Sequence, residues 1–93
     1  MKCDIFCEGV KEWIDSRYGG KYFFEYQDYP DFPTDPAIEM LLESPEHKVY
    51  VRCFVYKEAI EQNDDPLAIQ ILANALLTDL GEKIYLTFYE PAT

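Results

Sequence analysis

Positive charge is scarce in this sequence. Its 93 residues contain eight Lys and Arg against eighteen Asp and Glu, which gives a formal net charge of −10 at pH 7. A polyanion repels the phosphate backbone, which otherwise supplies much of the affinity in protein–nucleic acid complexes. The composition therefore argues against direct nucleic-acid binding and predicts a basic partner, either a protein or a nucleoprotein complex.

Long hydrophobic runs are also missing. No apolar segment approaches the roughly 20 residues that cross a bilayer, and no basic region followed by an apolar stretch marks a signal peptide. Membrane surfaces are usually anionic, so they disfavour peripheral binding of an acidic chain. Three cysteines without a secretion signal indicate reduced thiols. We therefore expect a cytoplasmic protein, in the host-cell cytoplasm if a phage encodes it, without membrane contact.

Motifs for catalysis and cofactor binding are lacking. The four glycines form no phosphate-binding loop, and His47 is the single histidine. Cys3, Cys7, Cys53 and His47 are zinc-ligand types, but the strand between His47 and Cys53 spans about 20 Å, too far for one ion. A catalytic thiol needs a nearby base and an electropositive setting, which this chain does not offer. We expect no cofactor, no metal and no enzymatic activity, with the cysteines serving as small apolar residues.

Apolar residues, in contrast, are plentiful. Hydrophobic residues make up 48% and aromatic residues 16% of the chain, enough for a real core. Neither repeats nor a linker divide it, and 93 residues fit a single hydrophobic core. Residues 1–93 are therefore predicted to form one compact acidic domain.

Hydrophobic periodicity and turn residues predict six elements. Gly19 and Gly20 end the first of them, Asp65 caps the fifth and Gly81 closes it. In chain order the elements are a helix over Asp4–Tyr18, strands over Lys21–Tyr26, Ala37–Glu43 and Lys48–Lys57, a helix over Leu67–Leu80 and a strand over Lys83–Glu90.

The segment Ala37–Glu43 allows two interpretations. Asp35-Pro36 before it is typical of a helix start, whereas its alternation of apolar and other residues is typical of a strand. Pro45 follows at the second position of a four-residue turn, which favours a hairpin slightly.

The predicted fold class is α+β. A single-layer, mostly antiparallel sheet of about four strands carries two helices on one face, in the order α-β-β-β-α-β. Alternate residues of the last two strands would lie under the helices: Val49, Val51, Cys53, Val55, Ile84, Leu86 and Phe88. The other sheet face would carry Tyr50, Arg52, Phe54, Tyr56, Tyr85, Thr87 and Tyr89.

Many of the eight tyrosines are interleaved with acidic residues, as in Glu25-Tyr26, Asp28-Tyr29 and Tyr89-Glu90, which is typical of a protein-binding surface. Tyrosine buries apolar area while keeping a polar tip, and it is enriched at interfaces. Reversing the charges of Asp28, Asp31 and Asp35 together is expected to abolish binding. The predicted partner-binding residues are Glu25, Asp28, Tyr29, Asp31, Asp35, Glu39 and Glu43.

These features favour a non-enzymatic inhibitor that binds and blocks a basic, nucleic-acid-handling protein, acting as a monomer or dimer. Its carboxylates would imitate the phosphates of a duplex. In size and charge the chain is similar to phage anti-defence proteins, including anti-CRISPR proteins, and to toxin immunity proteins. An ordinary solvated acidic surface is the alternative interpretation of the same charge. A small enzyme using a carboxylate pair or a metal is a third.

The helix Leu67–Leu80 is apolar almost all round, since no charged residue precedes Asp79. Such a helix is usually buried on more than one side. Either the first helix covers it, or a neighbouring subunit does.

A structural role is the second function class. The segment Val51–Leu80, a strand, a spacer and an Ala- and Leu-rich helix, resembles small phage tail-terminator or tail-completion proteins. That resemblance implies a ring whose acidic lumen lets DNA slide, with Leu67–Leu77 at the subunit contacts.

Overall fold

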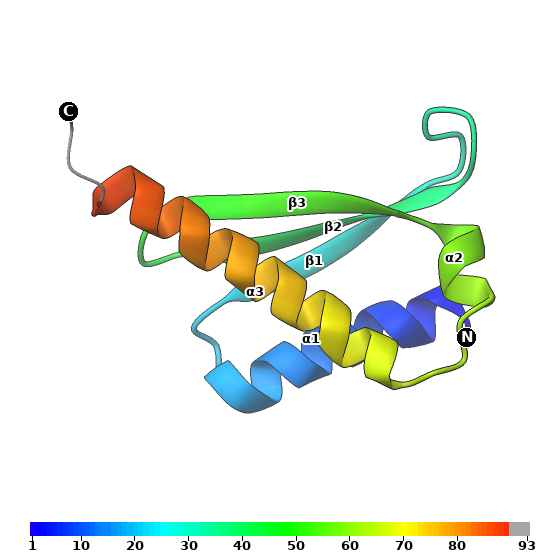
Figure 1. The fold of residues 1–93 in the computed structure, drawn as a ribbon, viewed down its shortest axis with the longest axis horizontal. Coiled ribbons are helices and arrows are strands. Elements are labelled where there is room, and N and C mark those ends of the chain that lie inside the picture. Colours follow the sequence, from blue (N-terminus) through cyan, green and yellow to red (C-terminus); the bar gives the residue numbers. More distant parts are fainter. Residues whose placement is uncertain (90–93) are drawn as a thin grey trace.

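The computed structural model describes residues 1–89 and shows an α+β fold, a three-stranded antiparallel sheet with helices on one face (Figure 1). The class is as predicted, but the predicted four strands are wrong. The elements are α1 (Cys3–Tyr18), β1 (Phe23–Tyr29), β2 (Ala37–Ser44), β3 (Val49–Tyr56), α2 (Lys57–Glu61) and α3 (Leu67–Phe88).

The first helix forms as its apolar spacing predicts. Its buried residues recur at three and four positions: Phe6, Cys7, Val10 and Ile14. Gly19 ends the helix in the left-handed conformation, with φ +45°, and its N–H donates to the carbonyl of Asp15. A residue with a Cβ pays a steric cost there, so glycine makes this stop sharp.

The ambiguous segment Ala37–Glu43 is a strand. It belongs to β2, which pairs antiparallel with β1 on one side and β3 on the other. The β2–β3 turn spans residues 45–48, with Lys48 at φ +56°, and the Ser44 hydroxyl lies 2.9 Å from Nδ1 of His47. His47 is thus a turn residue, as its position in the sequence predicts.

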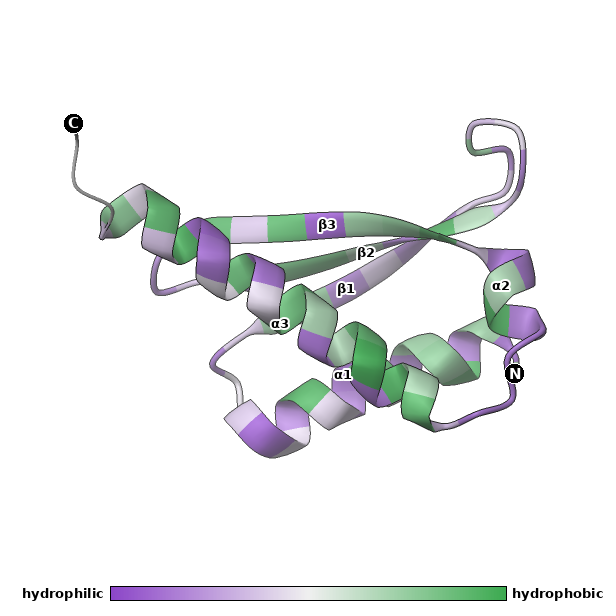
Figure 2. Cartoon of the chain, in the orientation of Figure 1, coloured by the Kyte–Doolittle hydropathy of each residue, from purple (hydrophilic) through white to green (hydrophobic). Residues whose placement is uncertain are grey.

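The sheet order is β1-β2-β3, so β2 is central. Alternate residues of β2 and β3 face the helices, among them Met40 and Leu42, which are fully buried. Figure 2 shows hydrophobic and hydrophilic residues alternating along the half of β3 next to the β2–β3 turn, and continuous hydrophobic colouring along most of the rest. Together with Phe24 of β1, the four buried residues of α1, Ile60 of α2 and three α3 residues, these side chains form the core.

The predicted last strand, Lys83–Glu90, is wrong. Helix α3 runs through Gly81 to Phe88, and Glu90 lies outside the described residues. Ile84 falls four residues after buried Leu80 and continues the stripe that faces the core. Gly81 costs a helix only about 1 kcal/mol, so the longer stripe outweighs this cost.

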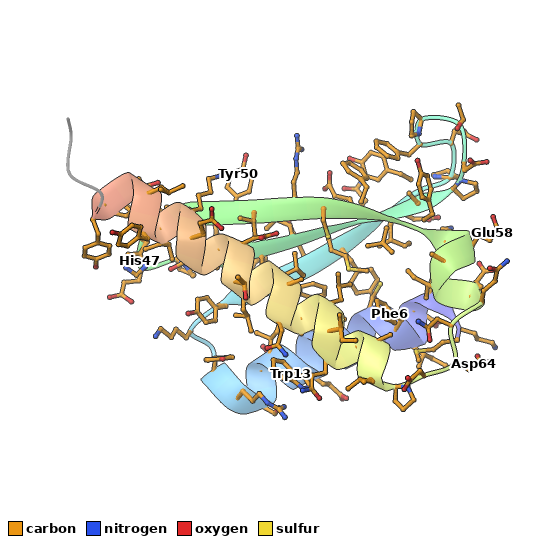
Figure 3. All side chains as sticks on the ribbon, in the orientation of Figure 1. Phe6, Trp13, His47, Tyr50, Glu58 and Asp64 are labelled. Atoms are coloured by element: carbon orange, nitrogen blue, oxygen red, sulfur yellow. The ribbon has the colours of Figure 1, made fainter. Side chains whose placement is uncertain are left out.

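Tertiary contacts fix the end of α3 against the β2–β3 hairpin. Nζ of Lys83 donates a hydrogen bond of 2.7 Å to the carbonyl of Tyr50. The rings of His47 and Phe88 lie 5.7 Å apart, and Figure 3 places His47 beside this end of the helix. The predicted placement of Tyr85, Thr87 and Tyr89 on the sheet is therefore also wrong.

Of the predictions for the segment that leads into α3, the position of Asp65 at the start of the helix is as expected, but the polar stretch before it is not. Asp65 accepts a hydrogen bond of 3.0 Å from the N–H of Leu67 at the start of α3. The polar stretch before it holds one unpredicted element, α2.

Helices α1 and α3 approach closely at Gly9, where a Cβ would lie 2.6 Å from Cδ1 of Ile69.

None of the helices in residues 1–89 combines the length and the hydropathy that crossing a membrane requires.

Candidate functional site

Within residues 1–89, one face of the sheet carries no helix. All three helices contribute to the core on the other face, and Tyr50 projects from β3 away from α1 (Figure 3). We call this uncovered surface the open sheet face. It consists of Phe23, Glu25, Gln27 and Tyr29 of β1, Glu39, Leu41 and Glu43 of β2, and Tyr50, Arg52, Phe54 and Tyr56 of β3.

Three glutamates surround one leucine in the middle of this face. Glu25 is the direct partner of Leu41, while Glu39 and Glu43 lie two residues to either side of Leu41 on β2. Diagonal positions in an antiparallel pair are about 7–8 Å apart, so Glu25 is close to both other glutamates. The strand pairing therefore brings together three carboxylates that the sequence spreads over nineteen positions.

Among the residues that the structure describes, Glu39 is the one of these glutamates that forms an ion pair. Nη1 of Arg52 lies 3.7 Å from Oε2 of Glu39, and the Arg52 side chain is 60% exposed. An ion pair with so exposed a partner contributes little to stability. Glu25 and Glu43 form no ion pair within residues 1–89.

Large aromatic side chains flank the glutamates. Phe23, Tyr50 and Tyr56 are each about half exposed, at 51%, 46% and 49%. Phe23 and Tyr50 both lie beside Glu43, because the register pairs Glu43 of β2 with Phe23 of β1 on one side and with Tyr50 of β3 on the other. Apolar surface next to uncompensated carboxylates is chemistry that fits a partner with both basic and apolar side chains.

The β1–β2 loop packs onto one end of the face. The Phe32 ring stacks on the Phe54 ring with centroids 3.9 Å apart and planes 4° apart, and Tyr29 meets Phe54 edge-on at 5.4 Å. Aromatic pairs in such arrangements contribute more than their buried area alone. This aromatic cluster holds the loop that carries Asp31 and Asp35 at the edge of the open sheet face.

The structure separates the predicted binding residues into three groups. Asp28 lies on the helix-facing side of β1 and forms an ion pair with Lys57, and this hydrogen bond raises the pKa of Lys57. Asp31 and Asp35 lie on the loop. Glu25, Tyr29, Glu39 and Glu43 share the open sheet face. These four are the part of the predicted set that the fold brings together.

Carboxylates also lie elsewhere, so the acidic surface is diffuse. Asp4, Glu8, Glu12 and Asp15 are exposed along α1 at helical spacing. The hydroxyl of Tyr26 donates to Oε1 of Glu8 at 3.3 Å, and partial burial followed by that carboxylate raises the pKa of Tyr26. The open sheet face differs from the α1 row because its carboxylates lie among exposed aromatic rings.

The cysteines lie in the interior or at its edge. Burial raises the pKa of Cys7 to about 12, and burial followed by the charge of Asp79 raises that of Cys53. Within residues 1–89, no three His, Cys, Asp or Glu side chains come together as a metal site. His47 contacts Ser44 and Phe88, on the turn at the far end of β3 from Tyr56.

Sequence reasoning did not assign three members of this surface, Phe23, Gln27 and Leu41. Phe23 alternates with Glu25 inside the predicted strand Lys21–Tyr26, so strand periodicity alone could have placed both on one face, whereas Gln27 lay outside that predicted strand. The stacking of Phe32 on Phe54 joins residues 22 positions apart and has no signal in the sequence.

No family model, curated protein or solved structure matches this chain. Any functional interpretation therefore rests on the surface itself.

Proposed function

We propose that this protein is a non-enzymatic binding protein that uses the open sheet face to occupy a basic surface of another protein. The partner class is a nucleic-acid-handling protein, whose cationic channel the carboxylates would block in place of phosphate. The observation that carries the proposal is the triangle of Glu25, Glu39 and Glu43 around Leu41, with exposed aromatic rings beside it.

Charge supports this partner class. The net charge of −10 attracts a basic protein over distances of about a Debye length, roughly 8–10 Å at physiological salt. Electrostatic steering of this kind accelerates association, and the binding weakens as salt rises. Phe23 and Tyr50 would supply the apolar anchors that charge alone lacks.

Rigidity supports the surface as the site. A β-sheet fixes the backbone positions of its alternate residues, so little backbone ordering is needed on binding. Met40 and Leu42, buried beneath the face, hold β2 in place. A docked partner would therefore meet three glutamates whose backbone positions have constant spacing.

The test is affinity capture from a cell extract with the immobilised protein and two double charge reversals. Glu25→Lys with Glu43→Lys changes the open sheet face. Glu12→Lys with Asp15→Lys makes the same change in net charge on α1. We expect the unaltered protein and the α1 variant to retain the same basic protein, and the open-face variant to lose it at least about tenfold in affinity.

Two results would contradict the proposal. The first is capture of no basic protein at low salt. The second is equal loss with both variants, which would show that net charge alone matters. A discrete ring of five or more copies would instead favour the structural role in a phage particle.

A further inference from the structure

The outer side of α3, which points away from the sheet, is exposed and largely apolar. Leu67, Ile71 and Tyr85 are 51%, 61% and 55% exposed, although α1 packs on the same helix. Of the two alternatives left open for this helix, burial by the first helix alone therefore does not account for these residues. We call this side the outer stripe, and its exposed residues are Leu67, Ile71, Asn74, Ala75, Thr78, Gly81, Glu82, Tyr85 and Tyr89.

The outer stripe has almost no charge. Residues 66–78 include no Asp, Glu, Lys or Arg, in a chain where 28% of residues are charged. Glu82 is the single charged residue of the stripe. Figure 2 shows mainly hydrophobic colouring along this helix.

The low charge of the outer stripe favours a second copy of the chain over a basic partner as the molecule that covers it. A basic partner gains little from a stripe with one carboxylate, Glu82, and it would be drawn to the acidic surfaces elsewhere. Two copies of the chain, each at −10, repel one another wherever their charged surfaces meet. The uncharged stripe is where a second copy approaches with the least repulsion.

The order of residue sizes in the stripe fits a two-fold pair. Small residues occupy its centre, Ala75, Thr78 and Gly81, and larger side chains lie toward both ends. Small residues let two helices approach closely, and a two-fold axis presents the same stripe from both copies.

We infer that two copies of this chain dimerise through the outer stripes of α3, packed antiparallel about a two-fold axis beside Thr78. This register brings Ile71 against Tyr85 of the second copy and Leu67 against its Tyr89. Asn74 meets Glu82, so the carboxylate of each stripe lies opposite an amide. Aliphatic side chains then bury against aromatic rings at both ends of the contact.

The expected affinity is modest. A helix of 22 residues is about 33 Å long, and one helix per copy buries an area at or below the roughly 800 Å² per partner of a standard interface. With net charge opposing the contact as well, we expect a dissociation constant in about the micromolar range. Because net charge opposes the contact, added salt is expected to strengthen the dimer, whereas it weakens binding to a basic partner.

The test is sedimentation equilibrium of the protein alone, from about 1 to 500 µM, at low and moderate salt. We expect a mass that rises from 10.9 kDa to twice that value. Ile71→Glu is expected to weaken the dimer roughly 100-fold, because two substituted positions enter one interface and each tenfold step is about 1.4 kcal/mol. Circular dichroism confirms that each variant is folded.

Two further variants separate packing from net charge. Ile71→Lys makes the protein less negative, yet it is expected to weaken the dimer as Ile71→Glu does. Ile5→Glu changes the same residue type on α1 at similar exposure, 56%, and is expected to leave the dimer intact. A monomer at every concentration, a larger ring, a stronger dimer with Ile71→Lys or an equal loss with Ile5→Glu would each overturn the inference.

This inference does not depend on the proposed function, since its test uses no partner. If both are correct, each dimer carries two open sheet faces, and complexes with the basic partner contain two copies of each protein. A monomeric protein that still captures a basic partner would refute the dimer alone.

Discussion

The two faces of β2 and β3 have the same strands and opposite compositions. On the covered face, Met40, Leu42 and Val49 are buried among residues of all three helices. On the open face, Glu39, Leu41 and Glu43 alternate with those same positions and remain partly exposed. Successive residues of one strand therefore have different roles, because a pleated strand sends their side chains to opposite faces of the sheet. The covered face holds the fold together, and the open face is free to meet a partner.

The largest effect is expected from a pair of substitutions on adjacent residues of β2. Met40 is fully buried, so Met40→Ala leaves a cavity and is expected to cost about 2–5 kcal/mol of unfolding free energy. Leu41→Ala, on the open face, is expected to cost about 1 kcal/mol or less. Urea denaturation followed by Trp13 fluorescence measures both. Equal losses would mean that the open face is packed as tightly as the covered one.

An intermediate effect is expected where the loop covers part of the open face. Phe54 lies between Tyr29 and Phe32, so Phe54→Ala is expected to cost about 1–3 kcal/mol. Tyr50, which faces solvent on the same strand, is the matched control at about 1 kcal/mol or less. The same denaturation experiment compares them. If Phe54→Ala costs no more than Tyr50→Ala, the aromatic cluster does not hold the loop.

The smallest effect concerns the covered face and leaves stability at neutral pH unchanged. With its pKa at about 12 instead of 9.0, the buried Cys7 thiol forms about 1,000-fold less thiolate near pH 8. Mass spectrometry after brief maleimide treatment is expected to find Cys7 unmodified in the folded protein and modified in urea. Rapid labelling of Cys7 in the folded state would show that α1 opens readily from the sheet.

The same shift sets a dependence of stability on pH. The pKa of the Cys7 thiol is about 12 in the folded state and 9.0 in the unfolded state. Its contribution to the free energy of unfolding is therefore fully present below pH 9.0 and is lost as the pH rises toward about 12, because the unfolded state releases the proton first. Denaturation at pH 8 and pH 10 is expected to show lower stability at pH 10. Cys7→Ser, which removes the titrating thiol, is the control and is expected to reduce this difference.

Local signals in the sequence predicted most of the elements. The spacing of Cys7, Val10 and Ile14 and the glycine at position 19 determined α1 and its end, because helix periodicity and a left-handed stop act within a few residues. The alternation in β3 likewise identified which of its residues face the helices. Both signals depend on neighbours along the chain.

The end of the chain was predicted wrongly because its local pattern is compatible with both structures. Ile84, Leu86 and Phe88 alternate as in a strand, while Leu80, Ile84 and Phe88 also recur every four residues as in a helix. The contact of Lys83 with the Tyr50 carbonyl joins residues 33 positions apart. Packing against the hairpin therefore settled what local propensity left open.

The sequence by itself determined the charge of this protein, its apolar helix and the alternation of its strands, since these properties reside in single residues and near neighbours. Only the tertiary structure decided which carboxylates lie together. Strand register placed Glu25 beside Glu39 and Glu43 and put Asp28 on the other side with Lys57. Register and layer packing depend on contacts between distant segments, and it is these contacts that create both the open sheet face and the outer stripe.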